Sequence, residues 1–215
     1  MGNPVEWVVK KIKEGHDLEL LDRPASNLIL VKALGRDYDP VLAGVIGMRT
    51  EITAAHVQSF FATDTSPAFI VNIPTTTPWR GDAIELIYAS DAAFGSLGDL
   101  DRAACLEYPP LYRERETDFF YKALCDHTNV SRVTLTYDKV FRVERRRGEP
   151  LMIAMINAYN LSAEDVRTAR ARYGHFDIAV KVSGYGSVTA SAEQAADTFG
   201  AQALTFGEMM GRVRQ

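Results

Sequence analysis

Hydrophobic residues recur along the chain with two periods, one typical of amphipathic helices and one typical of buried strands. From Val5 to Glu14 they fall every three or four positions, which predicts a helix that Gly15 ends. Val41 to Gly47 is apolar or small at every position, as in a central strand with both faces covered. The pattern therefore predicts a first helix and, further along, a buried strand.

Short strands and helices alternate through the rest of the chain, separated by turns rich in Pro, Gly and Ser. In the first half we expect strands at 17–22, 27–34, 41–47, 69–73 and 92–95, a turn at 23–26, a helix from Thr53 to about residue 62, and another from Asp82. In the second half we expect helices at 111–127, 162–173 and 189–199, strands at 132–145, 151–158, 176–182 and 203–206, and a helical turn at 208–213. No regular element is predicted from Leu100 to Pro110.

The helix at 162–173 has a capping pattern at each end. Ser162 is followed three positions later by Asp165, which is typical of a helix N-terminus. Gly174 follows the last periodic residue and predicts its C-terminal stop. These caps define the bounds of this helix.

The second half of the chain repeats the pattern of the first. An overlay with an offset of 109 positions and no gap places Phe69–Val71 on Ile178–Val180, Ala83 on Ala192, and Gly98–Leu100 on Gly207–Met209. Few identities survive, so a chance likeness is the alternative to a duplication. We interpret the pattern as two similar α/β units, 1–108 and 109–215, packed together, each with a mostly parallel or mixed sheet flanked by helices.

The composition is that of a globular protein. Hydrophobic residues make up 47% of the 215 positions and charged residues 24%, which argues against long disorder. No segment approaches the ~20 apolar residues of a membrane span, and the start of the chain lacks signal-peptide features, so we expect a cytoplasmic protein without a membrane partner. Cys105 and Cys125 lack nearby ligand-type partners, which favours buried, reduced thiols.

Charge is distributed unevenly between the halves. Residues 1–108 contain 9 Lys and Arg and 15 Asp and Glu, whereas residues 109–215 contain 15 and 13. An acidic partner such as nucleic acid is therefore expected to bind the second half. The sequence pI of about 5.6 argues against a strongly cationic, general nucleic-acid binder.

Each half contains, over about sixty residues, a core strand, a capped helix, an apolar strand, a Thr-bearing loop, an Ala-rich helix and a short strand. In the second half these are 151–157, 161–173, 177–182, 187–189, 190–199 and 203–206, followed by Gly207-Glu208-Met209. This order resembles the later part of a restriction-endonuclease-like domain of the Mrr type. The resemblance implies a fold more than an activity.

The chain departs from that family at the metal site. The family's nucleases hold a divalent metal with an Asp and an acid-x-Lys pattern on core strands, because carboxylates are the hard ligands that Mg²⁺ requires. The strands 41–47 and 151–157 contain neither an acid nor a Lys. Asp138, Glu144 and Arg146 have a related order on the preceding strand, but Arg cannot act as a base, and a salt-bridged strand edge is the better interpretation.

Two polar loops between a strand and a helix are candidate ligand-binding sites. The leading candidate is the Gly-rich loop Gly184-Tyr185-Gly186-Ser187, because open α/β sheets bind ligands at the carboxyl ends of their parallel strands. Its counterpart in the first half, Thr75 to Gly81, offers Trp79 for stacking on a base and Arg80 for a phosphate. The candidate residues are Thr77, Trp79, Arg80, Gly184, Tyr185, Gly186, Ser187 and Thr189. Neither loop has a recognised phosphate-binding pattern, so a tight turn without a ligand is the alternative.

Arginines dominate the basic part of the second half, and they are candidates for nucleic-acid contacts if strand edge and helix face converge. They are Arg142, Arg145, Arg146, Arg147, Arg167 and Arg170. Interleaved acids make a salt-bridged surface the alternative. His16, His56, His127 and His175 lack metal-ligand spacing, and no Gly-x-Ser-x-Gly elbow is present, so we expect no metal, no cofactor and no serine nucleophile.

We therefore expect a non-catalytic protein associated with nucleic acid or with an assembly and built from degenerate nuclease-like units. The alternative is a nucleotide- or small-molecule-binding α/β protein, with or without an enzymatic activity, that uses the two polar loops. A third interpretation is a structural protein that pairs through a sheet edge or helix face, either with another protein or as a homo-oligomer.

Overall fold

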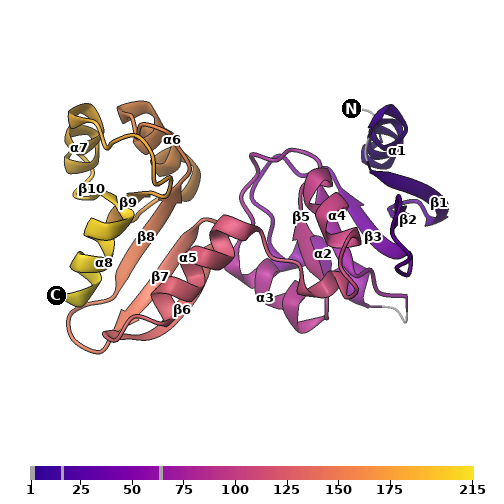
Figure 1. Ribbon diagram of the computed structural model, residues 1–215, viewed down its shortest axis with the longest axis horizontal. Helices are drawn as coiled ribbons and strands as arrows, with labels where there is room; N and C mark the ends of the chain where they lie inside the picture. Colours follow the sequence, from indigo (N-terminus) through magenta and orange to yellow (C-terminus); the bar gives the residue numbers. More distant parts are fainter. Residues whose placement is uncertain (1–2, 16, 63–64) are drawn as a thin grey trace. The chain divides into compact units, whose positions relative to one another are not determined.

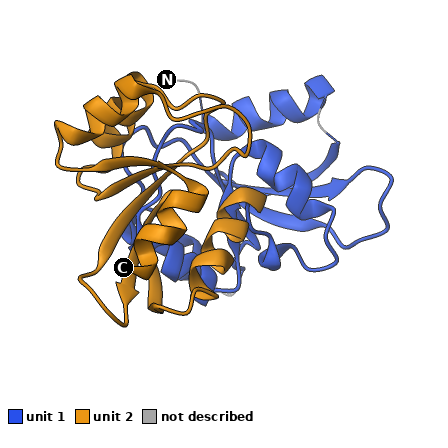
Figure 2. Ribbon diagram, turned by 60° about the vertical axis from the view of Figure 1, so that its left-hand side comes forward, with its two compact units in different colours: residues 1–114 blue, residues 115–215 orange. Residues whose placement is uncertain are grey.

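A computed structural model describes residues 3–15, 17–62 and 65–215, and the chain divides into two compact units. Unit 1 comprises residues 1–114 and unit 2 residues 115–215 (Figure 2). Both are α/β, as the sequence predicts. Within the described ranges, none of the helices combines the length and apolar character needed to span a bilayer.

Unit 1 alternates strands with short helices (Figure 1). Its elements are α1 (Pro4–Gly15), β1 (Leu18–Ala25), β2 (Leu28–Ala33), β3 (Val41–Ile46), α2 (Ala54–Val57), the 3₁₀ helix η1 (Gln58–Phe61), β4 (Phe69–Asn72), α3 (Gly81–Ala89), β5 (Ala93–Gly95), α4 (Leu97–Ala104) and the 3₁₀ helix η2 (Pro109–Leu111).

Unit 2 repeats this order. Its elements are α5 (Arg115–Cys125), β6 (Val130–Tyr137), β7 (Val140–Arg145), β8 (Leu151–Ile156), α6 (Ala163–Tyr173), β9 (Ile178–Lys181), α7 (Ala190–Asp197), β10 (Gln202–Thr205) and α8 (Phe206–Arg214). The caps at Ser162 and Gly174 are confirmed, and the predicted bounds of α6 hold to the residue at its C-terminus.

Each unit contains one five-stranded mixed sheet. The strand order is β1-β2-β3-β4-β5 in unit 1 and β10-β9-β8-β7-β6 in unit 2. In both, an antiparallel hairpin leads into the central strand, and the last three strands are parallel. Both hairpins also contain a register shift. The predicted central position of the strand at 41–47 is confirmed.

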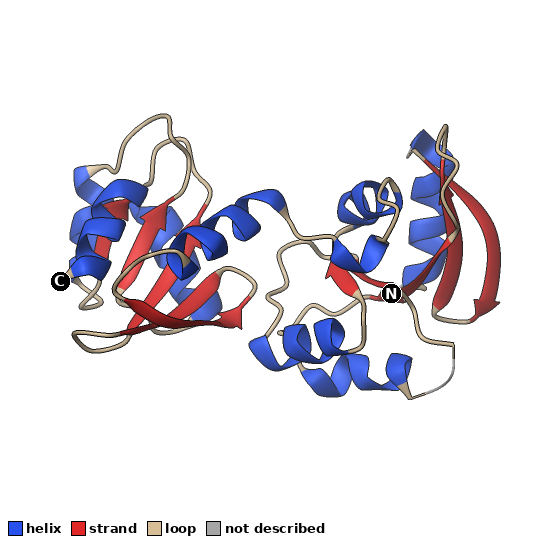
Figure 3. Cartoon of the chain, turned by 60° about the horizontal axis from the view of Figure 1, so that its bottom comes forward, coloured by secondary structure: helices blue, strands red, loops and turns tan. Residues whose placement is uncertain are grey.

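The sheets are covered by helices on both faces (Figure 3). In unit 2, Phe120 of α5 and Met209 of α8 pack on one face, and Val166 of α6 and Ala196 of α7 pack on the other. In unit 1, α1 and α4 share a core with the strands. Burial of both faces explains why the central strands are apolar throughout.

The two units correspond at the predicted offset of 109 positions. Isolated parallel bridges join Ile52 to Trp79 in unit 1 and Leu161 to Val188 in unit 2. The helix N-caps Ser96 and Thr205 differ by the same offset. The agreement of bridges, caps and strand order supports one repeated structural unit rather than a loose likeness of patterns.

The structure corrects three predicted elements. The expected strand at 132–145 is the hairpin β6–β7, which turns at Asp138 and Lys139. The expected turn at 23–26 largely belongs to β1, where the register shift absorbs Pro24 at an exposed sheet edge. The segment predicted to be irregular from Leu100 is helical up to Ala104, because the capping box of Ser96 and Asp99 begins α4, and only residues 105–108 are irregular before η2.

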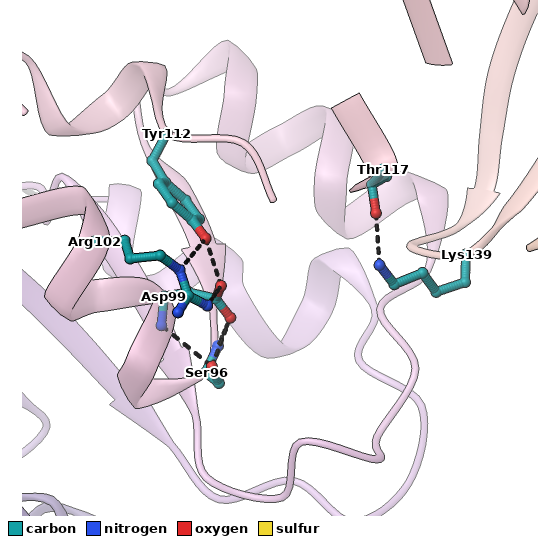
Figure 4. A network of polar contacts seen from close by, with 6 residues as sticks. All are labelled: Ser96, Asp99, Arg102, Tyr112, Thr117 and Lys139. Carbon is teal, nitrogen blue, oxygen red and sulfur yellow. Dashed lines mark hydrogen bonds and ion pairs between the residues drawn. The ribbon is translucent and has the colours of Figure 1, made fainter. Parts of the chain in front are cut away.

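The boundary between units lies at 114/115 rather than at 108/109, because Tyr112 packs into unit 1. The Tyr112 hydroxyl donates to the Asp99 carboxylate at 2.5 Å and accepts from Arg102 Nε at 3.1 Å (Figure 4). Burial opposes ionisation of Asp99, but hydrogen bonds from Ser96, Tyr112 and Arg102 outweigh it and lower the pKa of this carboxyl. The expected helix at 111–127 therefore begins only at Arg115.

Replacement of Tyr112 by Phe is expected to destabilise unit 1 by about 1.5–3 kcal/mol at pH 7, because a hydrogen bond to a charged carboxylate is lost. The pKa of Asp99 is lower in the folded protein than its ordinary value of 3.8, so this contribution is fully present above that pH and is lost as the pH falls. Urea unfolding at pH 7 and near pH 3 measures both effects. An equal destabilisation at the two pH values would contradict the assignment.

Candidate functional site

Two loops of unit 2 meet at the carboxyl ends of the parallel strands β8 and β9. We call the loops 157–162 and 182–189 together the tyrosine loops. The backbone N–H of Leu161 donates to the Ser187 carbonyl at 2.9 Å, and that of Thr189 donates to the Leu161 carbonyl at 3.1 Å. Asn160 Oδ1 also accepts from the Ser187 N–H at 2.9 Å. The two loops therefore form one hydrogen-bonded platform.

Lys181, the last residue of β9, fixes one of the two loops through hydrogen bonds from its buried side chain. It is only 2% exposed, and its Nζ ammonium donates to the carbonyls of Ser183 and Tyr185. Within the described part of the chain, no carboxylate forms an ion pair with it. The carbonyl dipoles of Ser183 and Tyr185 thus stabilise the positive charge of Lys181, and the same hydrogen bonds fix the backbone of the loop 182–189.

Gly186 permits the close approach of the two loops. Its φ of 78° lies in the left-handed region, and a Cβ at this position would meet the Tyr159 carbonyl oxygen at 1.9 Å. The adjacent Tyr185 is 78% exposed and Tyr159 is 70% exposed, more than any other large apolar side chain that the structure describes. The platform therefore presents two aromatic rings to solvent.

The equivalent loop of unit 1 is closed instead. Asn72 occupies the position of Lys181, is 2% exposed, and bonds through its amide to Met48 and Pro74. Thr77 is 5% exposed and donates to the Met48 carbonyl at 2.7 Å. The predicted stacking role of Trp79 is wrong, because this side chain is 5% exposed and packs on Phe94 at 4.7 Å.

Arg80 keeps a half-exposed side chain at the N-cap of α3. Its guanidinium pairs with Glu51 at 3.4 Å and with Asp82 at 3.6 Å. These carboxylates compete with a phosphate for the same donors. Of the three predicted ligand-binding residues in unit 1, none has the exposed, unpaired geometry that ligand binding requires.

Five arginines gather at the opposite end of the sheet of unit 2. Arg145 ends β7, the turn between β7 and β8 supplies Arg146 and Arg147, and the C-terminal turn of α8 supplies Arg212 and Arg214. We call these five residues the arginine cluster. The turn lies beside the C-terminus of α8 (Figure 1).

Side-chain hydrogen bonds hold the cluster together. Asn129 Nδ2 donates to the carbonyl of Arg147 at 3.0 Å and to that of Val213 at 2.9 Å. Arg145 Nε donates to the Glu149 carbonyl at 2.7 Å, and its Nη1 donates to the Arg212 carbonyl at 3.4 Å. The other four guanidinium groups form no ion pair with any residue that the structure describes.

The six predicted arginines do not form one surface. Strand residues alternate between faces, so Arg142 points to the face opposite Arg145, where it pairs with Glu144 at 2.6 Å. Arg167 and Arg170 lie on α6, on the sheet face away from α8, and Arg170 bonds to His175. The sheet therefore separates Arg145 from the α6 arginines, whereas Arg142 lies on the same face of the sheet as α6.

The weak catalytic candidates also lie apart. Asp138 is in the turn before β7 and Glu144 is near the end of that strand, so ~13 Å of strand separate Val140 from Glu144. The backbone N–H of Arg146 donates to the carbonyl of Asn129. No group of three or more His, Cys, Asp or Glu side chains that could hold a metal ion occurs in the described ranges.

The predicted burial of the two thiols is only partly correct. Cys105 is half-buried, whereas Cys125 is exposed at the end of α5, and both are free. His16 lies outside the described residues.

Sequence reasoning missed Lys181, Tyr159, Arg212 and Arg214. Lys181 ends an otherwise apolar strand, and this departure from the pattern was the available signal. The two arginines at the C-terminus of α8 have an ordinary favourable interaction with the helix dipole, which masks any further role.

Comparison with known proteins adds no relative to this description. No family model, no curated protein and no solved structure matches the chain. Inference about function therefore depends on the residues themselves.

Replacement of Lys181 by Met is expected to loosen the loop 182–189, because Met fills similar space without donating to the two carbonyls. Loss of hydrogen bonds from a charged group predicts cleavage by chymotrypsin after Tyr185 that is roughly 10-fold faster. Mass spectrometry of timed digests measures the rate. Lys122→Met removes an exposed ammonium from α5 and is the matched control, for which no change is expected.

Proposed function

We propose that this chain is a nucleic-acid-associated protein that binds through unit 2 and does not cleave the nucleic acid. The arginine cluster is the observation that carries the proposal. Guanidinium groups match phosphate geometry bidentately, and contacts to phosphates supply most of the sequence-independent affinity for nucleic acids. Arg146 and Arg147 are exposed on a turn, where a phosphate backbone has free access.

The backbone that carries the cluster is held by hydrogen bonds, which leaves the exposed arginines available to an external partner. Asn129 and Arg145 use side-chain hydrogen bonds to join the turn to the end of α8. Arg146, Arg147, Arg212 and Arg214 are left without an ion-pair partner among the described residues. Four like charges at one end of a small unit repel each other, and an anionic polymer relieves that repulsion.

The scaffold supports binding without hydrolysis. The α-β-β-β-α-β-α-β-α order of each unit is compatible with degenerate restriction-endonuclease-like units, which remain part of this proposal. The central strands β3 and β8 contain no carboxylate and no Lys. Hydrolysis by the route of such nucleases requires carboxylate ligands for a divalent metal.

The double substitution Arg146→Glu with Arg147→Glu is expected to weaken binding of a short DNA at least ~10-fold at low salt and to reduce the slope of log affinity against log salt by about 1–2. Fluorescence anisotropy over a salt series measures both quantities. The matched control is Arg36→Glu with Arg49→Glu, which changes the charge equally at exposed arginines of unit 1. Equal weakening by both pairs would refute a specific role for the cluster.

In a nuclease assay with Mg²⁺ or Mn²⁺, single-stranded and duplex DNA and RNA are expected to keep their length. Gel analysis of end-labelled substrates at high protein concentration measures this. Cleavage that Asp138→Ala or Glu144→Ala abolished would show that the chain is a nuclease and would overturn the non-catalytic part of the proposal.

A further inference from the structure

The most exposed aromatic side chains of unit 2 lie on two loops that are hydrogen-bonded to each other. Tyr159 and Tyr185 are 70% and 78% exposed, yet the backbone beside each is hydrogen-bonded to the other loop. Exposed rings gain little in a folded monomer, because burial is what makes an aromatic side chain stabilising. Rigid presentation of two rings lowers the entropic cost of binding a flat partner.

The backbone places the two tyrosines close together. A Cβ added to Gly186 would lie 1.9 Å from the carbonyl oxygen of Tyr159, and Tyr185 directly precedes Gly186. Two exposed tyrosines on adjoining loops offer ring faces for unpaired bases, because every base has a π-face that stacks on an aromatic side chain. The buried ammonium of Lys181 below adds a positive potential that attracts a phosphate-bearing ligand.

Unit 1 provides an internal comparison. At the offset of 109 positions, Tyr185 corresponds to Thr76, Gly186 to Thr77 and Lys181 to Asn72. The unit 1 loop is closed by neutral, buried side chains, so the fold itself does not require exposed tyrosines or a buried cation there. The tyrosine loops are thus a specific feature of the unit that also contains the arginine cluster.

The tyrosines and the arginines occupy opposite ends of β8. The arginine turn precedes Leu151 and the tyrosine loops follow Ile156, so the strand separates them by ~20 Å. A duplex keeps its bases stacked and paired, and it offers no free base face to a tyrosine. A single strand has unstacked bases that bind at one end while its phosphates bind at the other.

We infer that the tyrosine loops form a base-stacking site for single-stranded nucleic acid, with Tyr159 and Tyr185 as the stacking residues. The inference rests on the proposed function, because the arginine cluster supplies the phosphate contacts. Single strands bind both ends of unit 2, whereas duplexes bind the arginine cluster alone.

The test compares a single-stranded oligonucleotide of about 12 nucleotides with a duplex of the same length, near the middle of known site sizes for stacking proteins. Tyr159→Ala and Tyr185→Ala are each expected to weaken single-strand binding roughly 10-fold and to leave duplex binding within about 2-fold. Tyr185→Phe retains the ring face and is expected to bind normally. Tyr38→Ala removes an exposed ring of unit 1 and is the matched control.

The outcomes separate the two proposals. Unchanged single-strand binding by both tyrosine variants, together with loss of binding by Arg146→Glu with Arg147→Glu, would overturn the stacking site and leave the proposed function intact. Equal weakening of single-strand and duplex binding would also overturn the stacking site, since stacking acts on unpaired bases. Absence of nucleic-acid binding by the unaltered protein at low salt would overturn both.

Discussion

Buried polar side chains at the ends of doubly covered strands need hydrogen-bond partners, and this constraint shapes both units. Asn72 ends β4 and Lys181 ends β9, each is 2% exposed, and an unpaired polar group at such a position is costly. Asn72 pairs with Met48 and Pro74 in unit 1, and Lys181 pairs with the carbonyls of Ser183 and Tyr185 in unit 2. The loops at both strand ends take their shapes from these two polar anchors.

The same scaffold therefore supports two different surfaces. In unit 1 the neutral amide of Asn72 bonds to a loop in which Thr77 and Trp79 are buried. In unit 2 the ammonium of Lys181 bonds to the Tyr185 carbonyl, and the Tyr185 side chain is exposed to solvent. Within each unit, hydrogen bonds join the same pair of loops, at Ile52 and Trp79 in unit 1 and at Leu161 and Val188 in unit 2. Because the parallel strands and their helices carry the stability, the loop residues are free to differ, which is the usual relation between a fold and the sites built on it.

Strong local signals predicted much of the fold. Ser162, Asp165 and Gly174 define α6 through short-range caps, and the apolar run at 41–47 predicted a central strand because both of its faces are buried. Weak local signals failed. The Asp138-Lys139 turn has no Gly or Pro, so the β6–β7 hairpin read as one strand. Prediction of the candidate site failed where it depended on which residues lie close together in space, as with Arg142 and Arg145.

The sequence by itself determined the α/β class, the repeat at 109 positions and the excess of basic residues in the second half, because periodicity and charge are properties of local order along the chain. Only the tertiary structure decided which arginines lie together. Alternation along β7 separates Arg142 from Arg145, and a hydrogen bond across 67 positions brings Arg212 beside Arg145. Burial of Trp79 was likewise decided by packing, because its ring contacts Phe94, and the structure makes Trp79 equivalent to Val188 rather than to the exposed Tyr185.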